Sequence, residues 1–334
     1  MKKVSVIGDG GWGTALALLL RSKGNEVTIW GNFPDYVAQQ REKRENVKFL
    51  PGIEIPENIN YTADLAEAAE GAELFVCAVP TQFIRGVFEN FAAHYPKGVP
   101  VVSVAKGVER KTVKRCTEII SELLDGPPVA ALSGPSHAEE VARAVPTAVV
   151  VASADVELAR ELQDTFMLKT FRVYTQDDIV GVELGGALKN VIALAAGMCD
   201  GLGYGDNTKS ALLSRGLVEM SRLGVAAGAK RLTFTGLSGI GDLITTSFSP
   251  HGRNRAVGEK IGRGTDLRTI LESTEKVAEG VWTTISAREL AGKLGVTVPI
   301  TEQIHEVLFE GKEPGQAVVD LMTRGKKREI EDLE

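Results

Sequence analysis

Two lysines stand where a cation could assist chemistry on a carbonyl or hydroxyl group. Lys106 follows the β-branched run Val101–Val104, so it lies just past a predicted buried strand, and Lys189 stands inside an apolar helical stretch. An apolar setting disfavours the ammonium form, and a second cation nearby lowers the lysine pKa further, towards that of a general base. The alternative for each is a solvated side chain, with Lys106 in a loop and Lys189 reaching water through its long stem.

Acidic, hydroxyl and guanidinium groups follow glycine-containing turns elsewhere in the chain. Asp242 and Thr246 come after Gly239-Ile240-Gly241, and Gly252-Arg253-Asn254 opens a predicted helix. An arginine at a helix N-terminus is well suited to bind phosphate. The turn Ser133-Gly134-Pro135-Ser136 offers backbone N–H groups and a hydroxyl to an anion or a carbonyl. Taken alone, each of these turns is equally well explained as a helix cap.

The segment Gly8-Asp9-Gly10-Gly11-Trp12-Gly13 matches the G-x-G-x-x-G pattern of dinucleotide-binding loops. It lies between a strand-like run, Lys3–Ile7, and a helix predicted over Thr14–Lys23, and a second strand follows at Glu26–Trp30. In this setting the first glycine makes the turn, the second lets the backbone approach a pyrophosphate, and the third lets helix and strand pack closely. The pattern predicts a dinucleotide site; the alternative is merely a tight turn between a strand and a helix.

No acidic residue ends the second predicted strand, where NAD-binding proteins usually carry Asp or Glu for the ribose hydroxyls. The stretch reads Trp30-Gly31-Asn32-Phe33-Pro34, and the first acid is Asp35. The missing acid slightly favours NADP, but no arginine stands at this turn either. The choice between NAD and NADP is therefore left open.

The elements that must position these residues change in type along the chain. Up to about residue 178, strand-like runs alternate with amphipathic helices, which predicts an α/β domain with a doubly wound, mostly parallel Rossmann-like sheet. Further strands are predicted over Leu74–Val79, Val101–Val104, Val129–Leu132, Ala148–Ala152 and Phe171–Tyr174, and helices over Gln82–Ala93, Thr112–Leu124 and Ser136–Ala144. From residue 179 to 334 the stretches are helical, which predicts an all-helical domain. Because Lys189, Asp242 and Arg253 lie in it, we expect this domain to bind the substrate and to carry catalytic residues.

Composition excludes several classes of function. The 334 residues carry 38 Lys plus Arg against 44 Asp plus Glu, a formal charge of −6, without the concentrated basic face that a nucleic-acid binder needs. No run of about 18 apolar residues predicts a membrane span. Three distant cysteines fit a reducing compartment, so we expect a cytoplasmic protein. The histidines show no metal-ligand spacing, and no metal site is predicted.

Several motifs recur together in one known family. They are Gly8 to Ala17, Phe49-Leu50-Pro51-Gly52, Lys106-Gly107-Val108-Glu109, Ser133-Gly134-Pro135-Ser136, Glu183 to Asn190, Gly239 to Leu243, Arg253-Asn254-Arg255 and Glu279-Gly280-Val281. With this order and these sequences, residues 4 to 300 closely resemble the NAD(P)-dependent glycerol-3-phosphate dehydrogenases of the soluble bacterial type. The resemblance implies reversible hydride transfer between NAD or NADP and the C2 atom of sn-glycerol 3-phosphate or dihydroxyacetone phosphate, which supplies glycerol 3-phosphate for glycerophospholipid synthesis. It also suggests a homodimer.

The resemblance implies roles for individual residues. Lys189 would exchange the proton of the C2 hydroxyl, Lys106 would polarise the C2 oxygen and touch the cofactor, and Asp242 and Thr246 would orient the lysine or the substrate. The residues expected to bind substrate are Lys106, Gly134, Ser136, Lys189, Asp242, Gly252, Arg253 and Asn254. Those expected to bind the cofactor are Gly8, Gly10, Gly11, Trp12, Gly13, Asn32, Phe33, Lys106, Ala138, Arg253, Val277 and Glu279.

The chain departs from the family pattern at three places. Gly252 stands where the family often has serine, so a hydroxyl contact to phosphate is lost. His137 occupies a usually apolar aromatic position, and we interpret it as structural. Asn32 and Phe33 replace arginines of many relatives, which puts an NADP preference in doubt. Two alternatives are a related two-domain reductase of hydroxy or keto acids and a dinucleotide-sensing module without turnover. The second would not need Lys106, Lys189, Asp242 and Arg253 together.

Overall fold

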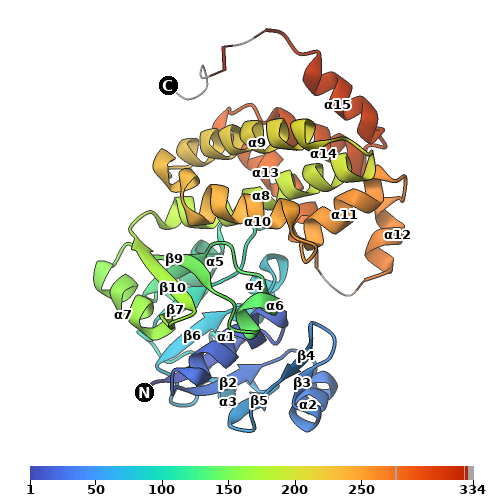
Figure 1. Ribbon diagram of the computed structural model, residues 1–334. Coiled ribbons are helices and arrows are strands. Elements are labelled where there is room, and N and C mark those ends of the chain that lie inside the picture. The colour runs from blue at the N-terminus through green and yellow to red at the C-terminus, as the bar shows by residue number, and fades with distance from the viewer. Residues whose placement is uncertain (275–276, 327, 330–334) are drawn as a thin grey trace. The chain divides into compact units, whose positions relative to one another are not determined.

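The computed structural model (Figure 1) describes residues 1–274, 277–326, 328 and 329. The chain divides into two compact units, each made of two segments. Unit 1 comprises Met1–Ala105 and Cys116–Ile179, and unit 2 comprises Lys106–Arg115 and Val180–Glu334. The short segment Lys106–Arg115 was expected in the N-terminal domain, whereas in the structure it belongs to unit 2.

Unit 1 is built on an eight-stranded sheet. In the order β10-β9-β8-β7-β6-β1-β2-β5, all neighbouring strands are parallel except β8 and β9, which pair antiparallel. The strands are β1 (Lys3–Ile7), β2 (Glu26–Trp30), β5 (Ile59–Thr62), β6 (Leu74–Cys77), β7 (Val101–Ser103), β8 (Val129–Ser133), β9 (Thr147–Ala152) and β10 (Phe171–Gln176). The chain runs outward from β1 in both directions, so the loop after β1 lies at the point where ligands bind in such sheets. The prediction of a mostly parallel sheet is confirmed.

Both faces of this sheet are covered. Leu74 and Val76 of β6 belong to one hydrophobic core, and Phe75 and Cys77, which point to the other face, belong to another. Helices and a small hairpin supply the rest of the unit: α1 (Gly11–Ser22), α2 (Pro34–Lys43), α3 (Leu65–Ala69), α4 (Thr81–Phe91), α5 (Cys116–Leu123), α6 (Ala138–Ala142), α7 (Val156–Phe166), and an antiparallel pair, β3 (Glu45–Asn46) and β4 (Leu50–Glu54).

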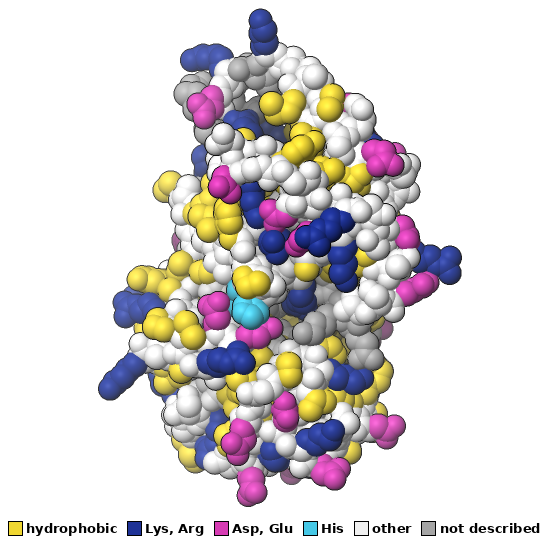
Figure 2. Space-filling model, turned by 45° about the vertical axis from the view of Figure 1, so that its right-hand side comes forward, with side chains coloured by type: hydrophobic (Ala, Val, Ile, Leu, Met, Phe, Trp, Pro, Cys, Tyr) yellow, Lys and Arg dark blue, Asp and Glu magenta, His cyan; other side chains and the backbone are white. Residues whose placement is uncertain are grey.

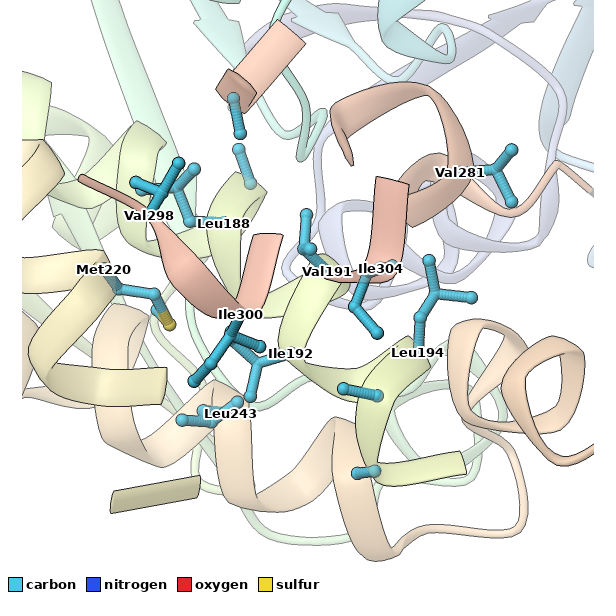
Figure 3. Packing of buried hydrophobic residues seen from close by; sticks show 14 of the residues in the cluster. Leu188, Val191, Ile192, Leu194, Met220, Leu243, Val281, Val298, Ile300 and Ile304 are labelled. Carbon is cyan, nitrogen blue, oxygen red and sulfur yellow. The ribbon is translucent and has the colours of Figure 1, made fainter. Parts of the chain in front are cut away.

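Unit 2 is helical, as expected. It contains α8 (Ile179–Gly201), α9 (Asp206–Ala226), a 3-10 turn (Arg231–Thr235), a π-helical turn (Leu237–Gly241), α10 (Asp242–Phe248), α11 (Arg253–Gly262), α12 (Leu267–Glu272), α13 (Glu279–Leu294), α14 (Pro299–Phe309) and α15 (Pro314–Met322). Figure 3 shows Leu188, Val191 and Ile192 of α8 packed among side chains of the other helices, including Leu243 of α10 and Ile300 of α14.

By length and composition, helix α8 is long and apolar enough to cross a membrane. The sequence analysis expected no such segment. However, 89% of its apolar window is buried inside the protein. Figure 1 shows α8 among the other helices of unit 2. Its apolar character is therefore that of a core helix, whose whole circumference faces other helices.

Helices α8 and α11 approach each other at backbone distance. A Cβ added at Gly258 would lie 2.0 Å from the Leu194 carbonyl oxygen, and one at Gly197 would lie 1.9 Å from that of Arg255. Only glycine fits at such contacts. The glycines thus bring the N-terminal end of α11 close to the helix that carries Lys189.

The helix predicted over Thr112–Leu124 begins later, at Cys116. Residues 106–115 instead form a loop closed by a bridge between Val108 and Arg115, with positive φ at Lys111 and Val113. Helical propensity is overridden here because the segment packs with unit 2, where Ser286 Oγ donates a hydrogen bond to the Val108 carbonyl.

Candidate active site

Unit 2 brings the two lysines of the sequence analysis to one carboxylate. Lys189 Nζ donates to Asp242 Oδ1 at 2.9 Å, and Lys106 Nζ donates to Asp242 Oδ2 at 2.7 Å. Lys189 also donates to the Thr246 hydroxyl. Lys189, Asp242 and Thr246 are each at most 5% exposed, whereas the Lys106 side chain is 17% exposed. The predicted group of four is therefore assembled in the structure, with Lys106 nearest to solvent.

The electrostatics of this group set its protonation. Burial lowers the pKa of Lys189 to about 8; Asp242 opposes this shift, while Lys106 and Arg253 add to it. Burial alone would raise the pKa of Asp242, but the two ammonium groups outweigh it and hold that pKa below its ordinary value. The sequence could not give the sign of these shifts, since it depends on the distances between the charges.

A turn of π-helix places Asp242 and Thr246. The turn ends at Gly241, so that Asp242 begins α10 and Thr246 follows on the same face four residues later. A Cβ at Gly185, four residues before Lys189, would lie 2.8 Å from the Ser238 carbonyl oxygen. This glycine therefore lets the π-helical turn pack directly on α8.

A chain of amide hydrogen bonds, which the sequence analysis missed, supports the group. Asn190 Nδ2 donates to the Lys106 carbonyl at 3.0 Å, and Asn190 Oδ1 accepts from Asn254 Nδ2 at 2.9 Å. Asn254 Oδ1 then accepts from the Gly280 N–H at 2.9 Å. Asn190 directly follows Lys189 in an apolar helix, and a buried amide in that place was the available signal. The chain fixes the backbone of Lys106 relative to α8, α11 and α13.

The N-terminus of α11 presents Arg253 to solvent. The Arg253 side chain is exposed and donates to the Val277 carbonyl at 3.1 Å, which brings together two residues expected at the cofactor. Among the residues that the structure describes, no side chain caps this helix, and such uncapped N–H groups can bind an anion. A Cβ on Gly252 would lie 2.5 Å from the Thr246 carbonyl oxygen, so a serine at this position would require the neighbouring backbone to shift.

The glycine loop of unit 1 has the form predicted for a dinucleotide site. Gly8 has φ of +123°, and a Cβ at Gly13 would lie 2.1 Å from the Gly8 carbonyl oxygen, whereas a Cβ at Gly10 would meet nothing within 4 Å. The N-terminus of α1, at Gly11, has no side-chain cap. Gly8 and Gly13 thus serve the turn and the packing, and Gly10 leaves open space where a pyrophosphate would approach. These residues fit a dinucleotide.

Asn46 in the β3–β4 hairpin anchors this loop and was also missed. It is fully buried; its Nδ2 donates to the Asp9 carbonyl and to the Thr14 hydroxyl, both at 2.8 Å. A Cβ at Gly11 would lie 2.6 Å from the Phe49 carbonyl oxygen. The glycine at position 11 is therefore required by the Phe49-Leu50-Pro51-Gly52 segment.

The remaining predicted site residues lie at the ends of elements. Asn32 and Phe33 are exposed after β2; Gly134 and Ser136 follow β8, with Ser136 Oγ donating to the Gly134 carbonyl at 2.9 Å. Three further residues expected at the cofactor lie at helix starts: Ala138 begins α6, Glu279 begins α13, and Trp12 lies in the first turn of α1. Most residues expected at substrate or cofactor thus lie at or near the ends of helices and strands.

Comparison with known proteins fits this geometry. The family model for the N-terminus of NAD-dependent glycerol-3-phosphate dehydrogenase matches residues 3–159, and that for its C-terminus matches residues 178–319. The chain belongs to this family. A relative from Geobacillus kaustophilus named glycerol-3-phosphate dehydrogenase [NAD(P)+] is 51% identical over 339 residues, which is 100% of this chain and 98% of the relative.

Solved structures agree with this membership. The crystal structure of glycerol-3-phosphate dehydrogenase from Coxiella burnetii has a TM-score of 0.94 and 36% identity, and the match covers 97% of this chain and 99% of that one. A ketopantoate reductase from Ralstonia eutropha, with a TM-score of 0.61 and 16% identity over 95% of this chain and 99% of that one, shares the fold alone.

Proposed function

We propose that this enzyme interconverts sn-glycerol 3-phosphate and dihydroxyacetone phosphate with NAD or NADP. The observation that carries the proposal is the buried group in which Asp242 holds the amines of both Lys189 and Lys106. Family membership supplies the substrate class. The match with a relative covers 100% of this chain and 98% of that relative, which supports the whole activity.

Lys189 exchanges the proton of the reaction. With a pKa of about 8, its amine can accept the proton of the C2 hydroxyl when the alcohol is oxidised, and its ammonium can return that proton when the ketone is reduced. When held by the loop Gly8 to Gly13, NAD or NADP would supply the hydride chemistry. The C2 atom loses two electrons with that hydride, so the proton on Lys189 completes the balance.

Lys106 and Lys189 stabilise charge at the C2 oxygen. Hydride addition to a ketone leaves negative charge on its oxygen, and two fixed cations favour that charge more than the neutral carbonyl. Asp242 keeps both amines in place between turnovers, and Thr246 accepts a hydrogen bond from Lys189.

Arg253, Asn254 and the N-terminus of α11 bind the substrate phosphate in this proposal. The exposed guanidinium and the uncapped helix end offer charge and N–H groups together. Gly134 and Ser136 are further substrate contacts that the resemblance implies. Gly8 to Gly13 hold the dinucleotide in this proposal, and the resemblance implies further cofactor contacts at Asn32, Phe33, Ala138, Val277 and Glu279.

The test is an assay of the purified protein with NADH and, separately, NADPH. Dihydroxyacetone phosphate is compared with unphosphorylated dihydroxyacetone and with ketopantoate. We expect turnover with dihydroxyacetone phosphate only. Turnover with ketopantoate, or cofactor binding without turnover of any substrate, would contradict the proposal and favour the reductase or the sensing module.

The biological setting is part of the proposal. We infer that the enzyme is a cytoplasmic homodimer that supplies glycerol 3-phosphate for glycerophospholipid synthesis. Its three cysteines, all in the described part of the chain, are buried and form no disulfide, as suits a reducing compartment. On the face seen in Figure 2, basic and acidic side chains are interspersed, which suits a small-molecule enzyme better than a nucleic-acid binder. Light scattering of the purified protein and fractionation of cells test the dimer and the location.

A further inference from the structure

Asp9 in the glycine loop lies where a side chain on Gly31 would be. Gly31 directly follows β2, the place from which an acidic residue reaches the ribose in many NAD-binding sheets. A Cβ added at Gly31 would lie 2.5 Å from Asp9 Oδ2 and 2.7 Å from Asp9 Cγ. The loop after β1 thus supplies a carboxylate to the end of β2, although β2 itself carries none.

Asp9 is fixed by its neighbours through both side chain and main chain. Gln40, on α2 and fully buried, donates its Nε2 to Asp9 Oδ2 at 2.7 Å, and Asn46 donates to the Asp9 carbonyl. The side-chain amide oxygen of Gln40, Oε1, has no hydrogen-bonding partner among the residues that the structure describes. The one interaction found for this buried amide is therefore the one that holds Asp9.

The Asp9 carboxylate is not neutralised by a cation. Within the described part of the chain, no lysine or arginine forms an ion pair with it. Arg44 is a nearby cation, since both it and Asp9 influence the pKa of Tyr61. Its guanidinium donates instead to backbone carbonyls, including that of Ile59 at 3.0 Å. Burial raises the pKa of Asp9, and the hydrogen bond from Gln40 opposes that rise.

We propose that Asp9 selects NAD over NADP by taking the place of the acid that β2 lacks. Its carboxylate accepts hydrogen bonds from the ribose hydroxyls of NAD, and it repels the 2′-phosphate of NADP, which carries about −1.5 to −2 charges at neutral pH. The preference comes from residue 9, so it is invisible in the sequence of β2, where a missing acid pointed the other way. The inference rests on the proposed function.

Direct binding tests the proposal without turnover. NADH and NADPH are titrated separately into the intact protein by calorimetry. We expect the wild type to bind NADH at least about tenfold more tightly than NADPH. Asp9→Asn keeps the shape of the side chain and removes its charge, so it should bind NADPH more tightly and lower the ratio of the two affinities about tenfold. The matched control is Asp35→Asn, which neutralises an exposed acid in the first turn of α2 and leaves the ratio unchanged.

The outcomes separate this inference from the proposed function. If neither dinucleotide binds the wild type, the proposed function fails. If both bind but the wild type prefers NADPH, or if Asp9→Asn leaves the ratio unchanged, Asp9 does not select the cofactor and the proposed function stands. Should the variant not fold, the wild type is titrated with adenosine 5′-phosphate and adenosine 2′,5′-bisphosphate. Tighter binding of the first supports the proposal, and tighter binding of the second overturns it.

Discussion

The Lys189 amine lies 2.9 Å from one oxygen of Asp242 in the buried centre of unit 2. The other oxygen of that carboxylate lies 2.7 Å from the Lys106 amine, so Asp242 is shared between two cations. A carboxylate with two partners cannot neutralise either fully, and so burial still lowers the pKa of Lys189. The geometry thus keeps the pKa of Lys189, the proposed proton acceptor, at about 8.

The pH dependence of the two directions should be opposite. Since the neutral amine of Lys189 is the base, kcat/KM for glycerol 3-phosphate oxidation should rise as pH increases through about 8 and then level off. For dihydroxyacetone phosphate reduction, which needs the ammonium, kcat/KM should be constant below that pH and fall above it. Initial rates at saturating cofactor measure both. A flat oxidation profile across this pH would contradict the assignment.

Replacing Lys189 should abolish most turnover. Lys189→Ala removes the group that exchanges the proton, so kcat should fall by about 10²- to 10⁴-fold while cofactor affinity is retained. Stopped-flow assays and cofactor titration measure the two effects. Lys293→Ala, at an exposed position late in α13, is the control and should behave as the wild type. Near-normal kcat in Lys189→Ala would show that another group is the base.

Asn190 should act as a positioning residue. Asn190→Ala leaves the Lys106 carbonyl and Asn254 without their buried partner, so the free energy of unfolding should drop by about 1–3 kcal/mol. We also expect kcat to fall more than KM changes, because Lys106 is no longer held. Chemical denaturation and kinetics measure these effects. A loss of stability with unchanged kcat would mean that the role of Asn190 is structural only.

Arg253 should bind the phosphate group. Arg253→Ala should raise KM for dihydroxyacetone phosphate by about 10- to 100-fold, as expected for a lost charge-assisted hydrogen bond, and should change kcat little. Weaker cofactor binding in the same variant would support a contact to both ligands. Arg263→Ala, at the opposite end of α11, is the matched control. An equal effect of both variants would point to general electrostatics instead.

The close approach of α8 and α11 should make stability sensitive to one methyl group. Gly258→Ala places a Cβ 2.0 Å from the Leu194 carbonyl oxygen and should destabilise the protein by about 1–3 kcal/mol or more. Gly292→Ala, in α13, meets nothing within 4 Å and should stabilise it by about 0.5–1 kcal/mol. Thermal unfolding compares them. Equal melting temperatures would contradict the packing described here.

The local sequence pattern predicted most elements of the fold, because the apolar residues of β1, β2 and α8 are buried in the structure and also favour the secondary structure that they form. It could not show that β9 pairs antiparallel with β8, since strand direction depends on the connection and not on strand composition. Nor could it show that residues 112–115 leave the helical pattern. Val113 is the left-handed residue among them, and it lies in a loop held by residues far along the chain, since Ser286 Oγ donates to the Val108 carbonyl and the Lys111 N–H donates to Glu289.

For the candidate site, residue types at turns pointed to Lys106, Lys189, Asp242 and Thr246, which the structure brings together. Asn190 and Asp9 escaped notice for a physical reason. The importance of Asn190 lies in a bond to the Lys106 backbone, and that of Asp9 in its proximity to Gly31, 22 positions away. Distances between residues far apart in sequence cannot be derived from spacing alone.

The segment Lys106–Arg115 makes the helical unit depend on a stretch encoded inside the other one. A gene fragment beginning at residue 180 would lack Lys106 and would present Asp242 to a single amine. The two halves are consequently not interchangeable modules. Exchanging the N-terminal half with that of another dehydrogenase would also exchange Lys106, one of the two amines that the Asp242 carboxylate binds.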